Sequence, residues 1–187
     1  MSGWKSLSIK KLYNTMRGEF QKVTWRILTC NNVGAPKRIF VLNLAIQRRL
    51  FTRDRLNNRG ITNVLSCPMC NEENETMDHL FFSCVVSKEV WGKVLKWQSI
   101  SRAALDWQKK IEWAERNAKG RNVDAQLYRV TLACVVYHIW RERNMRVFQG
   151  QQQPNEVLVR HIIQEVTSRG LMKNRPVKKL ETLNFYP

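Results

Sequence analysis

The stretch Cys67-Pro68-Met69-Cys70, followed by His79 and Cys84, decides how this chain is expected to fold. Its spacing is C-x2-C-x8-H-x4-C, which places four potential metal ligands within eighteen residues. Two thiols with two residues between them can turn both sulfurs toward one point. His79 and Cys84 are a little more than one helical turn apart, so a short helix can present both of them to that same point. Because three thiolates and one imidazole form a closed tetrahedral shell, we predict a structural Zn²⁺ site with the ligands Cys67, Cys70, His79 and Cys84.

The residues between the two halves of the motif favour this interpretation. Asn71 to Glu75 is a polar turn, Thr76 is suited to cap a helix, and Asp78 would lie in the first turn of that helix. Two alternatives stay open, a chance CPMC pair beside a surface histidine and a redox CxxC. The redox alternative lacks the strand-then-helix context that such a motif needs.

The signature extends beyond the four ligands. It consists of Cys67-Pro-Met-Cys70, Glu75-Thr76, Asp78-His79-Leu80-Phe81-Phe82, Cys84, Ser87 and Val90-Trp91, with Pro36-Lys37, Arg49 to Leu56, Gly60-Ile61, Ile139 to Asn144 and Val147-Phe148 around it. This signature resembles the zinc-binding region found downstream of the polymerase in plant LINE-type (non-LTR) retrotransposon reverse transcriptases, over roughly residues 20 to 150. The resemblance implies Zn²⁺ at the four ligand positions and a non-catalytic region. The 187 residues are too few to include the polymerase and endonuclease domains of that family.

Charge is the next most informative property of the chain. The formal net charge is +17, divided into +11 for residues 1–66, zero for residues 67–120 and +6 for residues 121–187. The sequence pI of about 10.2 is typical of a nucleic-acid-binding protein, because phosphates neutralise the excess of positive charge. A highly soluble surface without a particular partner stays open as the alternative.

The predicted fold class is mainly α: a helical domain built around a small CCHC zinc knuckle, with basic N- and C-terminal extensions. Four regions are expected, a basic helical region 1–60, the zinc-binding region 61–98, a helical region 99–150, and a helix with a basic tail 151–187. Apolar periodicity predicts helices over residues 6–30 with a break near Gly18, 37–51, 102–119, 124–148 and 155–168. Shorter helices are expected after Thr52, with an end at Gly60, and after Ser87 as a cap. No apolar run is long enough to span a membrane.

Arginines are concentrated next to the zinc motif. Arg48, Arg49, Arg53, Arg55 and Arg59 lie within twelve residues, and Asp54 is the only acid among them. The guanidinium fork matches phosphate oxygens, so this cluster is the main candidate for phosphate contact. The full set of predicted nucleic-acid-binding residues is Lys37, Arg38, Arg48, Arg49, Arg53, Arg55, Arg59, Lys178 and Lys179. Pairing of single arginines with Asp54 or with helix carbonyls is the structural alternative.

Several single residues have a structural interpretation. Trp91 lies at helical spacing beside the metal motif, so we expect it in the core rather than as a stacking platform for bases. Cys30 and Cys134 fall in helical patterns and are expected to be buried small apolar residues. His138 is expected to be a hydrogen-bonded core histidine. The segment from Trp140 to Asn144 is expected to close a packing interface, with Arg141 and Arg143 extending the basic surface.

These features favour a non-catalytic RNA-binding protein. The sequence contains no GxSxG, P-loop, HExxH or dinucleotide motif, and a deaminase would need an open zinc position and an HxE motif, so no enzymatic activity is expected. RNA is favoured over DNA, protein neighbours are possible, and neither a membrane nor a small-molecule substrate is expected.

Two other roles stay open. One is a structural subunit of a large ribonucleoprotein such as a ribosome, a mitochondrial one included, and the other is a decayed retroelement fragment. An intracellular, reducing compartment is expected from the cysteine pattern, and nucleus, cytoplasm and mitochondrion stay open. Residues 1–18 contain no acid, a feature that mitochondrial targeting segments share.

Overall fold

The computed structural model describes residues 8–18, 23, 25–30, 32–100, 107–120 and 122–171. These residues form helices and no β-strand; the isolated bridge between Ser66 and Asn74 is their only β-type pairing. The helices are α1 (Ile9–Arg17), α2 (Arg26–Cys30), α3 (Pro36–Ile46), α4 (Arg53–Asn57), the π-helix η1 (His79–Ser83), α5 (Val85–Trp97), α6 (Trp107–Asn117), α7 (Val123–Gln149) and α8 (Asn155–Leu171). The predicted mainly α class is confirmed, whereas the division into four regions stays a prediction.

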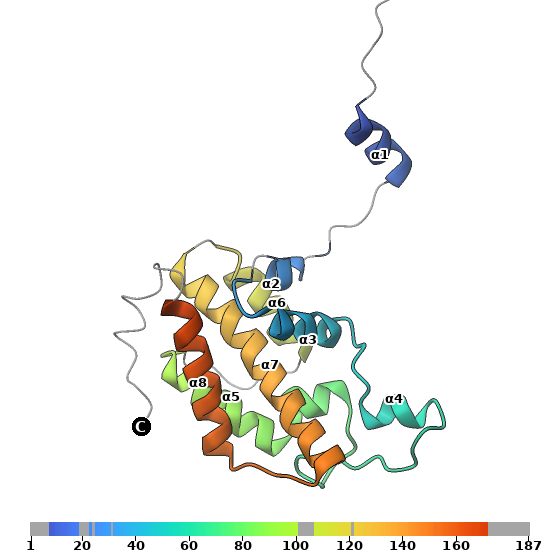
Figure 1. Cartoon of the computed structure of the whole chain (residues 1–187), viewed down its shortest axis with the longest axis vertical. Helices are drawn as coiled ribbons and strands as arrows, with labels where there is room; N and C mark the ends of the chain where they lie inside the picture. The colour runs from blue at the N-terminus through green and yellow to red at the C-terminus, as the bar shows by residue number, and fades with distance from the viewer. Residues whose placement is uncertain are drawn as a thin grey trace, which may run out of the picture.

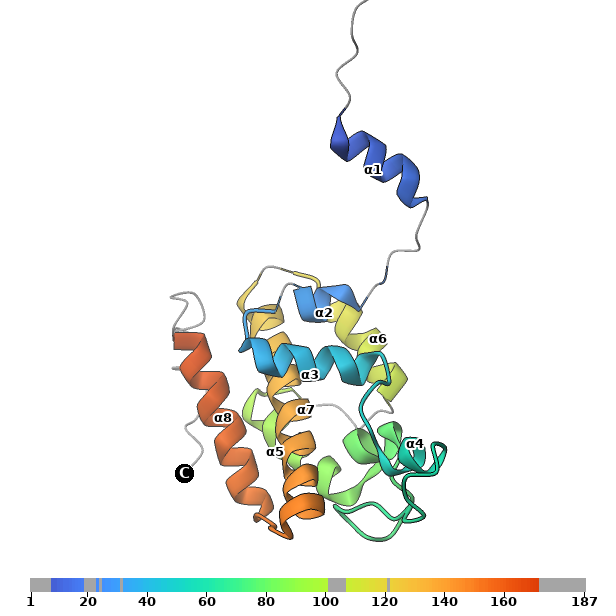
Figure 2. The same ribbon diagram turned by 45° about the vertical axis from the view of Figure 1, so that its right-hand side comes forward.

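The long helix α7 runs through the middle of the fold, with α3 and α8 packed against it (Figures 1 and 2). It begins where the Asn122 side chain accepts a hydrogen bond from the backbone N–H of Ala125 at 2.9 Å. It ends at Gly150, whose φ of 63° places it in the left-handed region that glycine tolerates best. Every residue from Leu127 to Ile139 is buried, so α7 is surrounded on all sides rather than covered along a single stripe.

Helices α5 and α8 pack against each other and complete the core. Val159, Ile162, Ile163 and Val166 of α8 are all buried, in agreement with the apolar periodicity that predicted this helix. The prediction that Ser87 caps α5 is wrong. The helix begins two residues earlier at Val85, and the buried Ser87 hydroxyl donates to the carbonyl of Leu80 at 2.5 Å.

The N-terminal region is interrupted near Gly18, as predicted. Its described residues include the helices α1 and α2, and α1 ends at Gly18, whose φ of 70° confirms the break. The apolar side chains of α1, including Leu12 and Met16, are exposed, and the helix stands away from the rest of the fold (Figure 1). The next helix, α3, stops at Ile46 instead of Phe51, because Arg48 adopts a positive φ of 54°.

The two cysteines outside the zinc motif have different environments. Cys134 is buried in α7 as predicted, and burial raises the pKa of its thiol to about 12. The prediction that Cys30 is buried is wrong, because it lies at the exposed end of α2. None of the described helices is long and apolar enough to cross a membrane.

Candidate metal centre and basic surface

A tight reverse turn brings Cys67 and Cys70 to the centre of the knuckle. Its two arms are joined by backbone hydrogen bonds from Cys67 N–H to the Glu73 carbonyl at 2.7 Å and from Glu75 N–H to the Leu65 carbonyl at 2.7 Å. The turn closes through Asn71, whose N–H donates to the Cys67 carbonyl at 2.8 Å and whose φ of 61° is one that asparagine tolerates well. The polar turn predicted between the two halves of the motif therefore folds the chain back on itself.

A capped π-turn positions the other two ligands. The Thr76 hydroxyl accepts a hydrogen bond from the N–H of His79 at 3.0 Å, which confirms the predicted cap. The N–H of Cys84 then donates to the carbonyl of His79 at 2.7 Å, the five-residue spacing of a π-helix. In an α-helix two residues five apart lie about 140° apart around the axis. The wider π-turn reduces that separation and lets both side chains face the cysteines.

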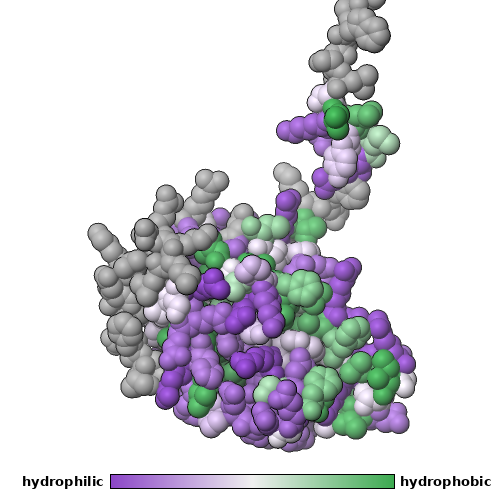
Figure 3. All heavy atoms as spheres, viewed as in Figure 1, coloured by the Kyte–Doolittle hydropathy of each residue, from purple (hydrophilic) through white to green (hydrophobic). Residues whose placement is uncertain are grey.

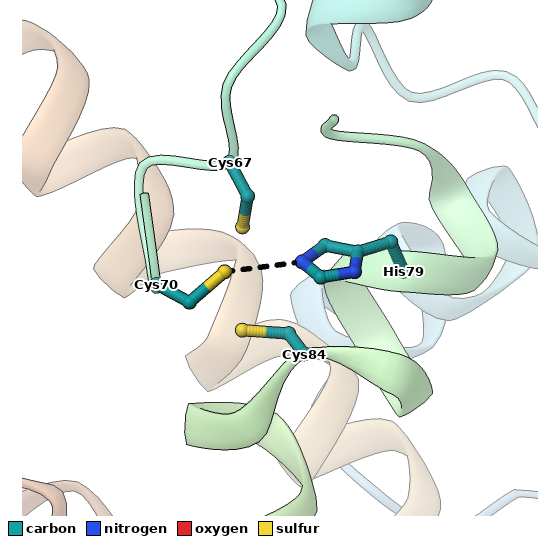
Figure 4. Close-up of side chains that lie close together, drawn as sticks. All are labelled: Cys67, Cys70, His79 and Cys84. Carbon is teal, nitrogen blue, oxygen red and sulfur yellow. Dashed lines mark hydrogen bonds between the residues drawn. The ribbon is translucent and has the colours of Figure 1, made fainter. Parts of the chain in front are cut away.

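The four predicted zinc ligands meet at one point (Figure 4). Their ligating atoms all lie within 4.8 Å of one another, and Cys70 Sγ is 3.3 Å from His79 Nε2. With Zn–S bonds of about 2.3 Å, the sulfurs of a tetrahedral site are roughly 3.8 Å apart, so the cluster needs only small adjustments to close on an ion. Three thiols and one imidazole are the donor set that zinc prefers. The predicted cofactor Zn²⁺ fits this site.

A carboxylate outside the shell fixes the orientation of the histidine. Glu73 Oε2 lies 3.0 Å from His79 Nδ1, so Nδ1 carries the proton and donates to the carboxylate. Nε2, the atom that faces Cys70, is then left with its lone pair for the metal. Zinc-bound histidines commonly have such a partner.

The arrangement of the thiols favours the deprotonated form of Cys84. A hydrogen bond from Cys67, together with N–H bonds from Ser87 and Val86 at the start of α5, lowers the pKa of Cys84 to about 5. The same bond to Cys84, followed by burial, raises the pKa of Cys67. In the metal-free cluster a second thiolate is therefore unfavourable, and a divalent cation removes that penalty.

A buried ion pair joins the knuckle to the central helix. Glu75 lies where the knuckle meets Thr76, and its carboxylate accepts from Arg143 of α7 through Nε at 2.7 Å and Nη2 at 2.8 Å. The backbone N–H of Arg53 is the third donor, at 2.8 Å. Both side chains are almost fully excluded from solvent. The prediction that Arg143 extends the basic surface is wrong, because its charge is neutralised inside the protein.

One turn further along α7, Arg146 contacts the CxxC turn directly. Its guanidinium donates to the carbonyl of Met69 at 2.8 Å and to the Glu142 carboxylate at 2.8 Å. That carboxylate also accepts from the backbone N–H of Gln153 at 3.0 Å. The CxxC turn, α7 and the loop before α8 are thus connected through two side chains.

Three of the predicted phosphate-binding arginines have partners within the protein. Arg48 forms a two-pronged ion pair with Asp78 at 2.9 Å on the surface. Arg53 donates to the carbonyl of Ser66. Arg38 lies 2.7 Å from Glu165, whose other oxygen is 2.9 Å from Nε2 of His138. His138 is therefore a hydrogen-bonded core residue, as predicted.

The other predicted basic residues differ in environment. Within the described part of the chain, Arg49, Arg55 and Arg59 have no ion pair, and Arg59 lies over the Phe51 ring at 5.0 Å from its centroid. Lys37 is exposed, with Nζ 5.7 Å from the centroid of the Tyr137 ring. Lys178 and Lys179 lie outside the described residues. Phosphate contact by this set stays a prediction.

Sequence reasoning missed three residues that support the site, Glu73, Glu75 and Arg146. Glu75 belongs to the Glu-Thr pair of the signature, and this was the only hint that it does more than lie in a polar turn. Trp91 lies in the core, as predicted. It is buried, and its indole N–H donates to the carbonyl of Phe81 at 2.9 Å.

Comparison with known proteins agrees with the geometry of the site. Residues 7–91 match the family described as zinc-binding in reverse transcriptase. The match includes all four ligand residues and ends at Trp91, so the resemblance of residues 139–148 and the restriction to plant LINE-type elements stay predictions. No curated protein matches this chain, and no solved structure matches it. The predicted resemblance to the reverse-transcriptase zinc-binding region is confirmed over the matched segment.

Proposed function

We propose that this chain, which contains a zinc-binding region of the reverse-transcriptase family over residues 7–91, is a non-catalytic RNA-binding protein. Zinc would order the knuckle, and arginines beside the knuckle would bind the phosphates of the RNA. The charged arrangement around α4 supports this proposal more than any other single observation. The proposal places the protein in a reducing compartment, where the thiols stay available for the metal.

The arginines around α4 are available for a ligand. Arg49 and Arg59 are exposed and Arg55 is half-buried, and no carboxylate among the described residues neutralises them. Asp54, the nearest acid in sequence, accepts a hydrogen bond from the hydroxyl of Thr52 instead. Uncompensated guanidinium groups on a protein of net charge +17 attract a polyanion.

The chemistry of the knuckle supports a structural rather than a catalytic metal. Four protein ligands occupy the four positions of a tetrahedral zinc ion, so no position is left for a reacting water. Glu73, the carboxylate nearest to His79, is engaged with the imidazole Nδ1. The residues of this chain would therefore hold the metal rather than use it.

Salt dependence tests the proposal directly. Binding of a fluorescent RNA to the zinc-loaded full chain should weaken by about a thousandfold between about 50 and 200 mM salt if six or more phosphates are contacted. The variant Arg49→Gln/Arg55→Gln/Arg59→Gln should reduce the slope of log K against log salt by about 2, since each single-strand contact contributes about 0.7. The matched control is Lys88→Gln/Lys96→Gln/Arg160→Gln, which removes three exposed charges from α5 and α8. Equal slopes for the two triple variants would reject the assignment to α4.

A subunit of a large ribonucleoprotein is a second candidate, favoured by the exposed apolar face of α1. Ile9, Tyr13 and Met16 recur on one side of this helix and are largely exposed. A particle of RNA and protein would bury this face. Sedimentation of the native chain with such a particle would support the second candidate, and sedimentation as a free protein would reject it.

A further inference from the structure

The segment from Phe51 to Val64, here called the α4 lobe, exposes apolar side chains next to its arginines. Phe51 is 49% exposed, Ile61 65% and Val64 52%. Figure 3 shows apolar residues among polar ones on the α4 side of the molecule. Exposed apolar side chains that gather on one small element commonly mark a binding surface.

Local hydrogen bonds hold the α4 lobe in one shape. The N–H of Ile61 donates to the carbonyl of Leu56 at 3.0 Å, and the Asn57 side chain donates to the carbonyl of Thr62 at 2.9 Å. The N–H of Val64 donates to the hydroxyl of Thr62 at 3.1 Å. The apolar side chains are thus presented on a preformed loop, which lowers the entropic cost of binding.

The lobe is fastened to the metal centre. The backbone N–H of Arg53 donates to the buried carboxylate of Glu75, and the Arg53 guanidinium donates to the carbonyl of Ser66, the residue before Cys67. The lobe therefore has a fixed position relative to the knuckle. A ligand on the lobe would contact a surface whose shape depends on the metal site.

The lobe carries one aromatic ring, Phe51, and, besides Arg53, the guanidinium groups of Arg55 and Arg59. Phe51, Arg55 and Arg59 are spaced four residues apart, and the Arg59 guanidinium lies over the Phe51 ring while about half of the Phe51 surface stays open. A ligand that matches this surface needs negative charges for the two guanidinium groups and a flat apolar face for the Phe51 ring. A single-stranded nucleic acid has both, whereas a duplex hides its base faces in the stack. An acidic protein would match the charge without supplying planar faces.

We propose that the α4 lobe binds single-stranded RNA, with a base stacked on Phe51, a neighbouring base packed against Ile61 and Val64, and phosphates held by Arg55 and Arg59. This inference rests on the proposed function and narrows it to unpaired RNA. Stacking on an aromatic side chain tolerates every base, so the site discriminates unpaired from paired strands rather than one sequence from another.

The test measures fluorescence anisotropy of the zinc-loaded full chain with a twelve-nucleotide single-stranded RNA and with a duplex RNA of the same length. The wild-type protein should prefer the single strand. Phe51→Ala should weaken binding of the single strand by between about five- and a hundredfold and leave its salt slope unchanged, because a stacked base releases no counterions. Ile61→Ser/Val64→Ser should act in the same direction, and duplex binding should change little in either variant.

Phe40→Ala is the matched control. Phe40 is similarly exposed but lies on α3, where it lines a different groove of about 620 Å³ together with Trp25 and Ile39. Zinc content and helicity verify that each variant is folded, as expected for exposed positions.

The outcomes separate the two proposals. Equal affinity for single strand and duplex, or a Phe51→Ala variant that behaves like Phe40→Ala, overturns the stacking site while salt-dependent binding still supports the proposed function. Absence of any salt-dependent RNA binding overturns the proposed function and the stacking site together. Equal binding of single-stranded DNA supports the stacking site and contradicts the choice of RNA.

Discussion

Arg143 on the central helix and Glu75 at the edge of the zinc knuckle form a bidentate ion pair, with N–O distances of 2.7 and 2.8 Å, in a place that solvent barely reaches. The two residues are 68 positions apart in sequence. Such a pair contributes modest net stability when it is intact, but loss of one partner leaves a buried charge without compensation. The position of the knuckle on α7 therefore depends on both residues being present.

Replacement of one partner tests this dependence. Glu75→Gln should lower the free energy of unfolding by about 3 to 5 kcal/mol, because Arg143 stays buried without a counter-charge. Urea unfolding at saturating zinc measures the change. The control Glu72→Gln lies on the exposed turn and should cost less than about 0.5 kcal/mol. The double variant Glu75→Leu/Arg143→Met should recover most of the loss, and similar stabilities for Glu75→Gln and Glu72→Gln would refute the dependence.

Metal content tests the ligand set. The purified chain should contain about one zinc ion, and Cys84→Ser should reduce this content to near zero, since a structural site needs all four ligands. The exposed Cys30 provides the matched control, and Cys30→Ser should keep its zinc. Chelation of the metal should expose the knuckle to protease. Full zinc content in the Cys84→Ser variant would exclude Cys84 as a ligand.

The hydrogen bond between Glu73 and His79 predicts a change in affinity without loss of the site. Glu73→Gln should weaken zinc binding by about 10- to 100-fold, because the imidazole loses the partner that fixes its protonation and orientation. A competition titration with a chromophoric chelator measures this change. Glu72→Gln removes a neighbouring acid of the same turn and should bind zinc like the wild type.

Stability should fall in mild acid because of His138. Burial lowers the pKa of His138 more than the hydrogen bond to Glu165 raises it, so the folded protein binds this proton less readily than the unfolded chain. For Glu165, burial favours a higher pKa, but hydrogen bonds from Arg38 and His138 outweigh it and lower the pKa. Folding therefore lowers the pKa of both groups. Above about pH 6.5, His138 is neutral in both states and does not change the free energy of unfolding. Below that pH the unfolded chain takes up the proton first, so the free energy of unfolding decreases by at most about 1.4 kcal/mol per pH unit.

His138→Gln should therefore flatten the dependence of the unfolding free energy on pH between about pH 7.5 and 5.5. Zinc must be saturating over this range, so that acid-driven release of the metal does not contribute. Glu72→Gln, on the exposed turn, is the control for a change outside the His138–Glu165 pair. Parallel curves for the wild type and His138→Gln would contradict the assigned direction.

The sequence by itself determined the metal site and the helical class. The C-x2-C-x8-H-x4-C spacing is local, so the ligands have few ways to arrange themselves around one ion, and Thr76 marks the start of the helix that carries His79. The apolar stripe of α8 was equally readable, because helical periodicity records which face is buried. Even here the sequence indicated only a short helix, and not the π-turn between His79 and Cys84.

Only the tertiary structure decided which charges face the solvent. Arg143, Arg53 and Arg49 are alike in the sequence, yet the first is buried with Glu75, the second bonds to the knuckle and the third is exposed. An arginine carries the same charge in every setting, and its partner comes from a distant part of the chain that is brought near only when the core packs. Apolar periodicity likewise predicted the N-terminal helix, but burial depends on a facing element, and apolar side chains of α1 such as Ile9 and Met16 remain exposed. Local spacing in the sequence therefore specified the residues that bind the metal. Long-range packing determined which arginines remain exposed and can bind a phosphate.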